Sequence, residues 1–311
     1  MTAAVLLTSD RPGPTNVYLI RRLYESRCVD AVVVVRPAGL RWKLRQLWRI
    51  GRRGGLRAIL RRMEARRLRA RLLDADQERL LAAELCGEAG NRLPPAPPGI
   101  RVFKAASLSS RRTLRLFRDL APELAIQAGA GWVRRPLLDV PRLGFLSLHH
   151  GMMPAIRGMD SILWAYVENR PEWIGITVQL IDEGLDTGRI VSQRRVPPES
   201  AEHPYSVMVR ATRIGAELMI DAIAALRSGA AFPTSSAGAG GAYRSSLTPE
   251  AVRALHDIIR SGCDRPSDST HDLGQSFNRR NDGFVPGRHW PHPSRDRPGA
   301  NIAPAADRTP P

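Results

Sequence analysis

The chain has 311 residues and a formal net charge of +17. That length can bury one sizeable core, with room for a small second unit. Its cysteines, Cys28, Cys86 and Cys263, are widely spaced and form no CxxC pair, which argues against a disulfide framework and a zinc site. No apolar run approaches the roughly 18 residues that span a membrane, and no secretory leader is recognisable. These features predict a cytoplasmic protein without a transmembrane segment.

The basic charge comes almost wholly from arginine, because lysine occurs only at positions 43 and 104. A charge this high usually suggests nucleic acid or an anionic membrane as a partner. Here the arginine bias accompanies abundant alanine, glycine and proline, a composition that a GC-rich coding sequence also produces. The global charge is therefore weak support for a nucleic-acid partner.

The first part of the chain alternates predicted strands with helices. Strands are expected over 3–8, 31–37, 99–105 and 123–130, with helices over 17–27 and 111–120. Strands that alternate with helices are typical of a doubly wound sheet. The prediction is a Rossmann-like α/β fold with a mostly parallel sheet. No GxGxxG or GxxxxGK[ST] motif follows the first strand, so the phosphate cradles of dinucleotide-binding and P-loop proteins are missing.

A basic helical insert is expected between the second and third strands, over 40–92. Gly51 and the Gly54-Gly55 pair predict a break between two amphipathic helices. Three roles stay open for the insert: a solvated lid packed on the sheet, an acceptor-binding element for a phosphate-bearing substrate, or a contact with a membrane surface or RNA. Its apolar stripes would also suit a dimer surface, so an oligomer stays open. The apolar residues recur at helical spacing: Leu40, Leu44, Leu47 and Trp48, then Leu56, Ile59, Leu60 and Met63.

The stretch from 144 to 191 gathers the polar groups of the chain. A strand over 144–150 would place Ser147 and His149 on one face and His150 on the other. Asp160-Ser161 is a helix-start signal. A second strand over 174–181 leads into an acidic, glycine-flanked loop. Strand, helix and strand predict a parallel βαβ unit, with the loops after 150 and 181 at the edge of the sheet where ligands bind.

The chain as a whole divides into four predicted parts. An α/β domain over 1–228 ends with an edge strand near 192–198 and a long amphipathic helix over 205–226. A flexible linker over 229–247 follows. A short helix over 248–262 has a threonine N-cap, a proline at its first position and a terminal glycine. The polar, proline-rich tail over 263–311 is expected to be disordered.

Several motifs together resemble the folate-dependent formyltransferase family. They are His149 with Pro154 and Arg157-Gly158, then Trp164-Ala165, Gly175-Ile176-Thr177, and Asp182-x-Gly184-Leu185-Asp186-Thr187-Gly188. The resemblance is specific over roughly 120–200 and compatible with 1–228 outside the insert. It implies transfer of a formyl group from 10-formyltetrahydrofolate to the primary amine of a small molecule, with nucleotide-linked amino sugars as the favoured acceptor class. Family members that act on tRNA carry a further β-rich domain, which nothing after 228 resembles, so a nucleic-acid acceptor is not expected.

The resemblance also assigns residues. His149 and Asp186 match the catalytic histidine and aspartate of the family, and Ser147 stands where the family has asparagine. It further implies that main-chain groups of two segments line the pteridine pocket. One wall would be Ala130, Gly131, Trp132 and Val133, and the other Ile181, Glu183, Gly184 and Leu185.

These residue types suit formyl transfer. Attack of an amine on a formyl carbon creates a tetrahedral oxyanion, which preorganised donors stabilise. A histidine can donate to that oxygen and carry protons, and a nearby carboxylate orients it and favours its charged form. The Ser147 hydroxyl is a donor too, on a shorter side chain than asparagine's.

Other functions remain open at this stage. Water in place of the amine would make the protein a 10-formyltetrahydrofolate hydrolase. With serine at the asparagine position, the chain could instead be a non-catalytic folate-binding or arginine-rich interaction protein. A metal hydrolase, with His149, Asp182 and Asp186 as ligands, is a more distant alternative.

Overall fold

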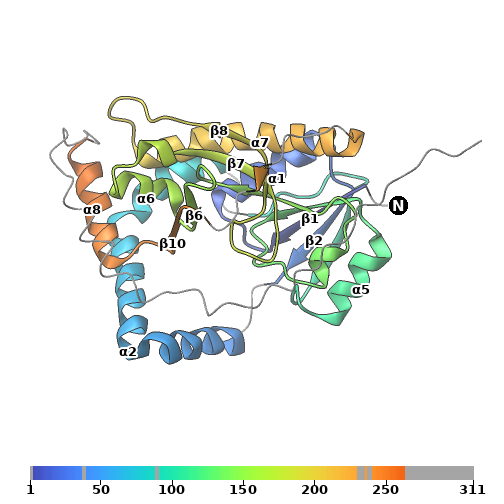
Figure 1. The fold of residues 1–311 in the computed structure, drawn as a ribbon, viewed down its shortest axis with the longest axis horizontal. Coiled ribbons are helices and arrows are strands. Elements are labelled where there is room, and N and C mark those ends of the chain that lie inside the picture. The colour runs from blue at the N-terminus through green and yellow to red at the C-terminus, as the bar shows by residue number, and fades with distance from the viewer. Residues whose placement is uncertain are drawn as a thin grey trace, which may run out of the picture. The chain divides into compact units, whose positions relative to one another are not determined.

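The computed structural model describes residues 3–36, 40–87, 90, 92–229, 235–236 and 240–262. The tail over 263–311, for which disorder is expected, lies outside the described residues, as do the side chains of Leu40, Leu44 and Leu47 in the insert. In the described residues up to 128, the elements are β1 (Ala4–Ser9), α1 (Pro14–Glu25), β2 (Ala31–Val35), α2 (Leu40–Leu72), α3 (Asp74–Asp76), a π-helix (Gln77–Ala82), α4 (Ala83–Cys86), β3 (Arg101–Ala105), α5 (Arg111–Leu120) and β4 (Leu124–Ala128). They continue with β5 (Phe145–His149), β6 (Ile156–Gly158), α6 (Ser161–Val167), β7 (Gly175–Leu180), β8 (Arg189–Arg195), α7 (Pro204–Ser228), β9 (Ser235–Ser236), β10 (Ala242–Arg244) and α8 (Pro249–Arg260) (Figure 1).

The central sheet is mostly parallel, as expected. Its strand order is β3-β2-β1-β4-β5-β7-β8-β9. The five strands from β3 to β5 are parallel to their neighbours, and β7, β8 and β9 pair antiparallel. The predicted strand near 192–198 is β8, which begins earlier, at Arg189, and pairs with β9 only through Arg189 and Ile190.

Both faces of the sheet are covered, which confirms the doubly wound class. Strand β2 is an unbroken run of buried alanine and valine, because each of its side chains meets a helix layer or a loop on one face or the other. Its Val32 and Val34 lie in the apolar cluster of α1 and α7, and Val33 and Val35 lie in that of α5. Hydrophobic burial on two sides thus fixes the register of the sheet.

The prediction of a parallel βαβ unit from β5 to β7 is wrong. His149 pairs with Thr177 and Leu146 with Leu180, so β7 runs antiparallel to β5. The reason lies in the connection. Met152 N donates to the carbonyl oxygen of Trp173 at 3.0 Å, so the chain leaves and re-enters the sheet at the same edge. The seven-residue helix α6 is about 10 Å long, too short to carry the chain back across the sheet.

The insert forms the expected pair of helices, but not a lid on the sheet. Helix α2 consists of two segments that meet at Gly55, whose φ of 65° and ψ of −169° are not helical. The second segment lies beside α8, with Arg61 paired to Glu250 at 2.8 Å (Figure 1). Leu68 and Leu72 pack on the apolar cluster that includes Leu163 of α6 and side chains of α7 and α8. Leu68 and Leu72, near the end of this segment, therefore turn toward other helices.

The prediction of a flexible linker over 229–247 is wrong for its last residues. Ala242–Arg244 form β10, which pairs in parallel with β6, while 230–234 and 237–239 lie outside the described residues. Trp164 Nε1 donates to the Ser245 carbonyl at 2.8 Å, and Arg244 forms an ion pair with Glu168. These contacts give a serine- and glycine-rich segment enough fixed partners to be ordered. The predicted helix that follows is confirmed as α8, capped by Thr248.

Asp160 precedes α6 as predicted, but its side chain does not cap the helix. Its φ is 55°, and no side-chain capping bond forms. The carboxylate instead accepts from Arg69 of α2 at 2.8 Å and from Leu247 N at 3.2 Å. One side chain thus joins the insert, α6 and the segment before α8.

In the part of the chain that the structure describes, no helix is long and apolar enough to cross a bilayer.

Helix α7 lies so close to the sheet that only glycine fits at position 215. A Cβ there would meet Ile176 Cγ1 at 2.6 Å and Leu148 Cδ1 at 3.0 Å. Overpacking of this kind costs about 1–3 kcal/mol, against a helix-propensity gain of about 0.5–1 kcal/mol for alanine. We expect Gly215→Ala to lower the free energy of unfolding by about 1–2 kcal/mol in urea titration. The exposed Asp221→Ala change in the same helix is the control, and equal stability of the two variants would contradict this packing.

Candidate functional site

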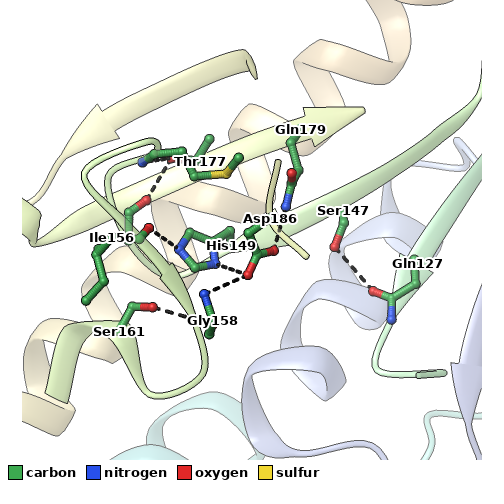
Figure 2. A network of polar contacts seen from close by, with 11 residues as sticks. Gln127, Ser147, His149, Ile156, Gly158, Ser161, Thr177, Gln179 and Asp186 are labelled. Atoms are coloured by element: carbon green, nitrogen blue, oxygen red, sulfur yellow. Dashed lines mark hydrogen bonds and ion pairs between the residues drawn. The ribbon is translucent and has the colours of Figure 1, made fainter. Parts of the chain in front are cut away.

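The candidate site lies on the sheet face that Ser147 and His149 share. Ser147 is paired with Gln127 of β4 on one side and with Gln179 of β7 on the other. Paired residues on neighbouring strands point to the same face, so the three polar side chains form a row across the sheet. His149 lies two residues along β5, in the next row with Thr177. Figure 2 shows these side chains close together.

His150 points to the opposite face, as predicted. Thr212 Oγ1 of α7 donates to the Met208 carbonyl at 2.7 Å and must therefore accept from His150 Nε2 at 2.9 Å. Burial, with a smaller contribution from His149, lowers the pKa of His150 to about 4. His150 is thus a neutral, structural residue at pH 7.

His149 is buried and held at both ring nitrogens. Nε2 lies 3.1 Å from the Ile156 carbonyl oxygen and Nδ1 lies 3.5 Å from Asp186 Oδ2 (Figure 2). Burial lowers the pKa of His149, while Asp186 and the Ile156 carbonyl oppose that shift. A neutral ring has one N–H, so it can donate to the Ile156 carbonyl or to Asp186 but not to both at once. A Cβ on residue 151 would lie 2.7 Å from His149 Nε2, so Gly151 makes room for the ring.

Asp186 reaches His149 by a route that differs from the predicted one. Because β7 runs antiparallel to β5, the 181–188 loop starts at the opposite end of the strands from His149. It then folds back along the face of the sheet. There the Asp186 carboxylate accepts from Gln179 Nε2 at 2.8 Å and from Gly158 N at 2.9 Å. Asp186 itself has a φ of 51°, a left-handed conformation that aspartate tolerates better than most residues. Three separate segments thus hold the carboxylate beside the imidazole.

Ser147 uses its hydroxyl proton within the protein. Its Oγ donates to Gln127 Oε1 at 3.2 Å, and Gln127 Nε2 donates to the Gly131 carbonyl at 2.9 Å. The amide orientation is fixed, because the Gly131 carbonyl can only accept. The second N–H of Gln127 is not used by these bonds, and the side chain is partly exposed. Ser147 therefore orients an amide group.

Sequence reasoning missed Gln127 and Gln179, and it gave Thr177 no role beyond its place in a motif. Gln179 is buried and fixes Asp186, and Thr177 Oγ1 donates to the Gly151 carbonyl at 2.7 Å. The available signal for these site residues was a polar side chain within the strands β4 and β7. Interior strands of a sheet that is covered on both faces normally carry apolar side chains. Their significance depended on strand pairing, which the sequence predicted only in part.

The two segments expected to line the pteridine pocket lie side by side. Val133 is buried in the same apolar cluster as Ala130 and Ile181. Arg135 Nε lies 3.6 Å from Glu183 Oε1, which links the segments at the surface. Trp132 and Leu185 are 52% and 39% exposed, and Met159, beside Gly158, is 56% exposed. Large apolar side chains exposed beside a polar site mark a surface that suits a flat, partly apolar ligand. The residues present therefore fit a pteridine.

The three residues proposed as metal ligands do not converge. Asp182 Oδ1 accepts from Gly184 N and Thr187 Oγ1 within its own loop. Within the described ranges, no three histidine, cysteine, aspartate or glutamate side chains are placed to hold a metal ion. The arrangement does not support the metal-hydrolase alternative.

Comparison with known proteins identifies the family of the chain. The sequence profile of the family described as formyl transferase matches residues 66–223, about half of the chain. The chain is 34% identical to methionyl-tRNA formyltransferase of Halorhodospira halophila over 167 residues, 51% of this chain and 53% of that protein. It is 36% identical to the enzyme of that name from Parvibaculum lavamentivorans over 132 residues, 42% of each chain. A solved 4-N formyltransferase from Francisella tularensis superposes with a TM-score of 0.46 at 15% identity, over 79% of this chain and 76% of that one.

The family match defines a group transferase, and the chain belongs to the formyl transferase family. It spans about half the length of the curated relatives that it matches. The profile match begins at residue 66, inside the insert, and so includes only the last part of α2, residues 66–72.

The low pKa of His150 predicts a pH dependence of stability. In the unfolded state His150 is protonated as the pH falls below its ordinary pKa of 6.5, whereas in the folded state it stays neutral until about pH 4. Stability is therefore present at neutral pH and is lost on acidification, by roughly 2–3 kcal/mol from this group. We expect His150→Gln, whose amide can donate to Thr212, to unfold like the wild type at pH 7 and to lose less stability at pH 4.5. Parallel curves of denaturation midpoint against pH would contradict this.

Proposed function

We propose that the protein transfers a formyl group from 10-formyltetrahydrofolate to a primary amine. The observation that carries this proposal is the pairing of His149 with Asp186 beside the adjoining segments 130–135 and 181–185. The amine would add to the formyl carbon of the donor to give a tetrahedral oxyanion. Collapse of this intermediate would break the bond from that carbon to the folate nitrogen. The four residues from Ala130 to Val133 would form one wall around the pteridine. Ile181, Glu183, Gly184 and Leu185 would form the other.

His149 would carry the proton. An amine that forms an amide must lose one proton, and the leaving folate nitrogen must gain one. Nδ1 lies 3.5 Å from Asp186, so the carboxylate would stabilise the charge when the ring takes up a proton. His149 could then return that proton to the leaving nitrogen. Burial keeps the ring neutral between turnovers, and Asp186 stabilises the brief charged form.

Gln127 and Ser147 would act together on the oxygen that becomes negative. The second N–H of Gln127 is an amide donor at the site, and Ser147 holds the amide in that orientation. A preorganised donor of this kind typically contributes about 10²–10³ in rate. In this assignment Gln127 supplies the amide donor and Ser147 is a positioning residue. The asparagine that the family has at position 147 would combine both roles.

The first test is release of tetrahydrofolate from 10-formyltetrahydrofolate, measured with no amine, with nucleotide-linked amino sugars and with methionyl-tRNA. The tRNA arm is included because the curated relatives that the chain matches are methionyl-tRNA formyltransferases. Amine-dependent turnover supports the transferase and selects the acceptor. Formate release without an amine would support the hydrolase. Folate binding without turnover in any arm would leave a binding protein.

Loss of the carboxylate charge should remove most activity. We expect Asp186→Asn to lower kcat by about 10² or more, because protonated His149 loses its counter-charge. Thermal unfolding should stay close to that of the wild type, since asparagine can keep one of the two hydrogen bonds. Asp119→Asn, at an exposed position of α5, is the control. Full activity in Asp186→Asn would contradict the role assigned to Asp186.

The shared role of Ser147 and Gln127 makes a double-variant prediction. Gln127→Glu removes the N–H but keeps the shape, and we expect kcat to fall about 10²-fold with KM little changed. Ser147→Ala should lower kcat by a smaller factor, and Ser147→Thr, which keeps a hydroxyl, should have much of the wild-type kcat. The double variant, Ser147→Ala with Gln127→Glu, should have the same kcat as Gln127→Glu alone. Additive losses would show that the two side chains act independently.

A further inference from the structure

Exposed apolar side chains in the described residues gather in two places. Eight large ones are exposed, and three of them, Trp132, Met159 and Leu185, belong to the candidate site. Val102 stands alone on β3. The other four all lie on helix α2: Trp48, Leu56, Leu60 and Met63. Single exposed apolar residues need no explanation, but a set on one helix indicates a surface that is covered by a partner.

The apolar residues of the second α2 segment form a stripe. Leu56, Leu60 and Met63 follow one another at spacings of four and three, so they lie on one side of the helix. They are 68%, 54% and 44% exposed. Helix α8 does not cover them, because it packs on the neighbouring side of α2, where Arg61 pairs with Glu250 and Glu64 pairs with Arg253.

The helix is strongly basic. Its 33 residues include twelve arginines and one lysine, against a single glutamate. That is a formal charge of +12, most of the +17 of the whole chain. Arg57, Arg62, Arg66 and Arg67 are exposed on the turns that carry the stripe. An apolar stripe flanked by arginines, with a tryptophan on the same helix, is the pattern of a helix that lies in a membrane interface.

From this pattern we infer that α2 docks the protein on anionic lipid surfaces, with Leu56, Leu60 and Met63 in the acyl boundary and the arginines on lipid phosphates. RNA would use the arginines but gives no apolar medium for leucine and methionine, since bases stack on aromatic rings. A second copy of the chain would bring one +12 helix against another. Of these three occupants, the anionic bilayer satisfies both the stripe and the charge. This inference does not depend on the proposed catalytic function.

The test is co-sedimentation of the full chain with vesicles. We expect binding to vesicles of phosphatidylcholine and phosphatidylglycerol, and little to phosphatidylcholine alone. The triple change Leu56→Ser, Leu60→Ser and Met63→Ser should weaken binding about tenfold or more. Val102→Ser, which removes an exposed apolar side chain elsewhere, should bind like the wild type. Circular dichroism and formyl transfer in solution should be unchanged in both variants.

The charge contribution has its own matched pair. Arg57→Gln, Arg62→Gln and Arg66→Gln should reduce binding about tenfold at low salt, whereas Arg111→Gln, Arg112→Gln and Arg115→Gln on α5 change the net charge equally and should not. Failure of the wild type to bind anionic vesicles would overturn the inference. So would a serine variant that binds as well as the wild type, RNA binding at least as tight as vesicle binding, or a dimer that the serine variant dissociates.

Discussion

The arrangement of the site depends on the Asp186 carboxylate. It accepts from a side chain of β7 and from the backbone at the end of β6, and it faces the imidazole on β5. These contacts pin the 181–188 loop across the face of the sheet. The same loop supplies Ile181 to the apolar cluster of α5 and Glu183 to the ion pair with Arg135. One partly buried carboxylate therefore positions both the proposed proton carrier, His149, and one wall of the proposed folate pocket.

Two opposing effects act on the charge of His149, and their combination suits proton transfer. Burial disfavours the imidazolium, yet both ring nitrogens face acceptors, which a charged ring would satisfy better than a neutral one. A site of this kind holds the base neutral and compensates the charge as it forms. On the other face of β5, His150 has no carboxylate, and burial simply keeps it neutral. Two adjacent histidines thus differ in role because the strand pleat gives them different neighbours.

The chain concentrates its exposed apolar surface at the site and on α2, and each set has a different electrostatic setting. At the site, Trp132, Met159 and Leu185 border a polar network that is fixed by hydrogen bonds. On α2, Leu56, Leu60 and Met63 lie among arginines. The first setting fits a small ligand with one reactive polar end, and the second fits an extended anionic surface. Helix α8 and Asp160 tie α2 to the remaining fold, so docking through α2 would hold the catalytic domain at the surface.

The sequence alone determined the fold class, the helical insert with its break near Gly55, and the side-chain types at Ser147, His149 and Asp186. These features follow from local patterns: uniform apolar runs give buried strands, and strand alternation sends His149 and His150 to opposite faces. Tertiary structure alone decided the direction of β7, the strand over 242–244 and the row of Gln127, Ser147 and Gln179. Each of these is a pairing between residues that are distant in the chain. Such pairings depend on which hydrogen-bonding partners and burial surfaces meet in space, and no local pattern records that choice.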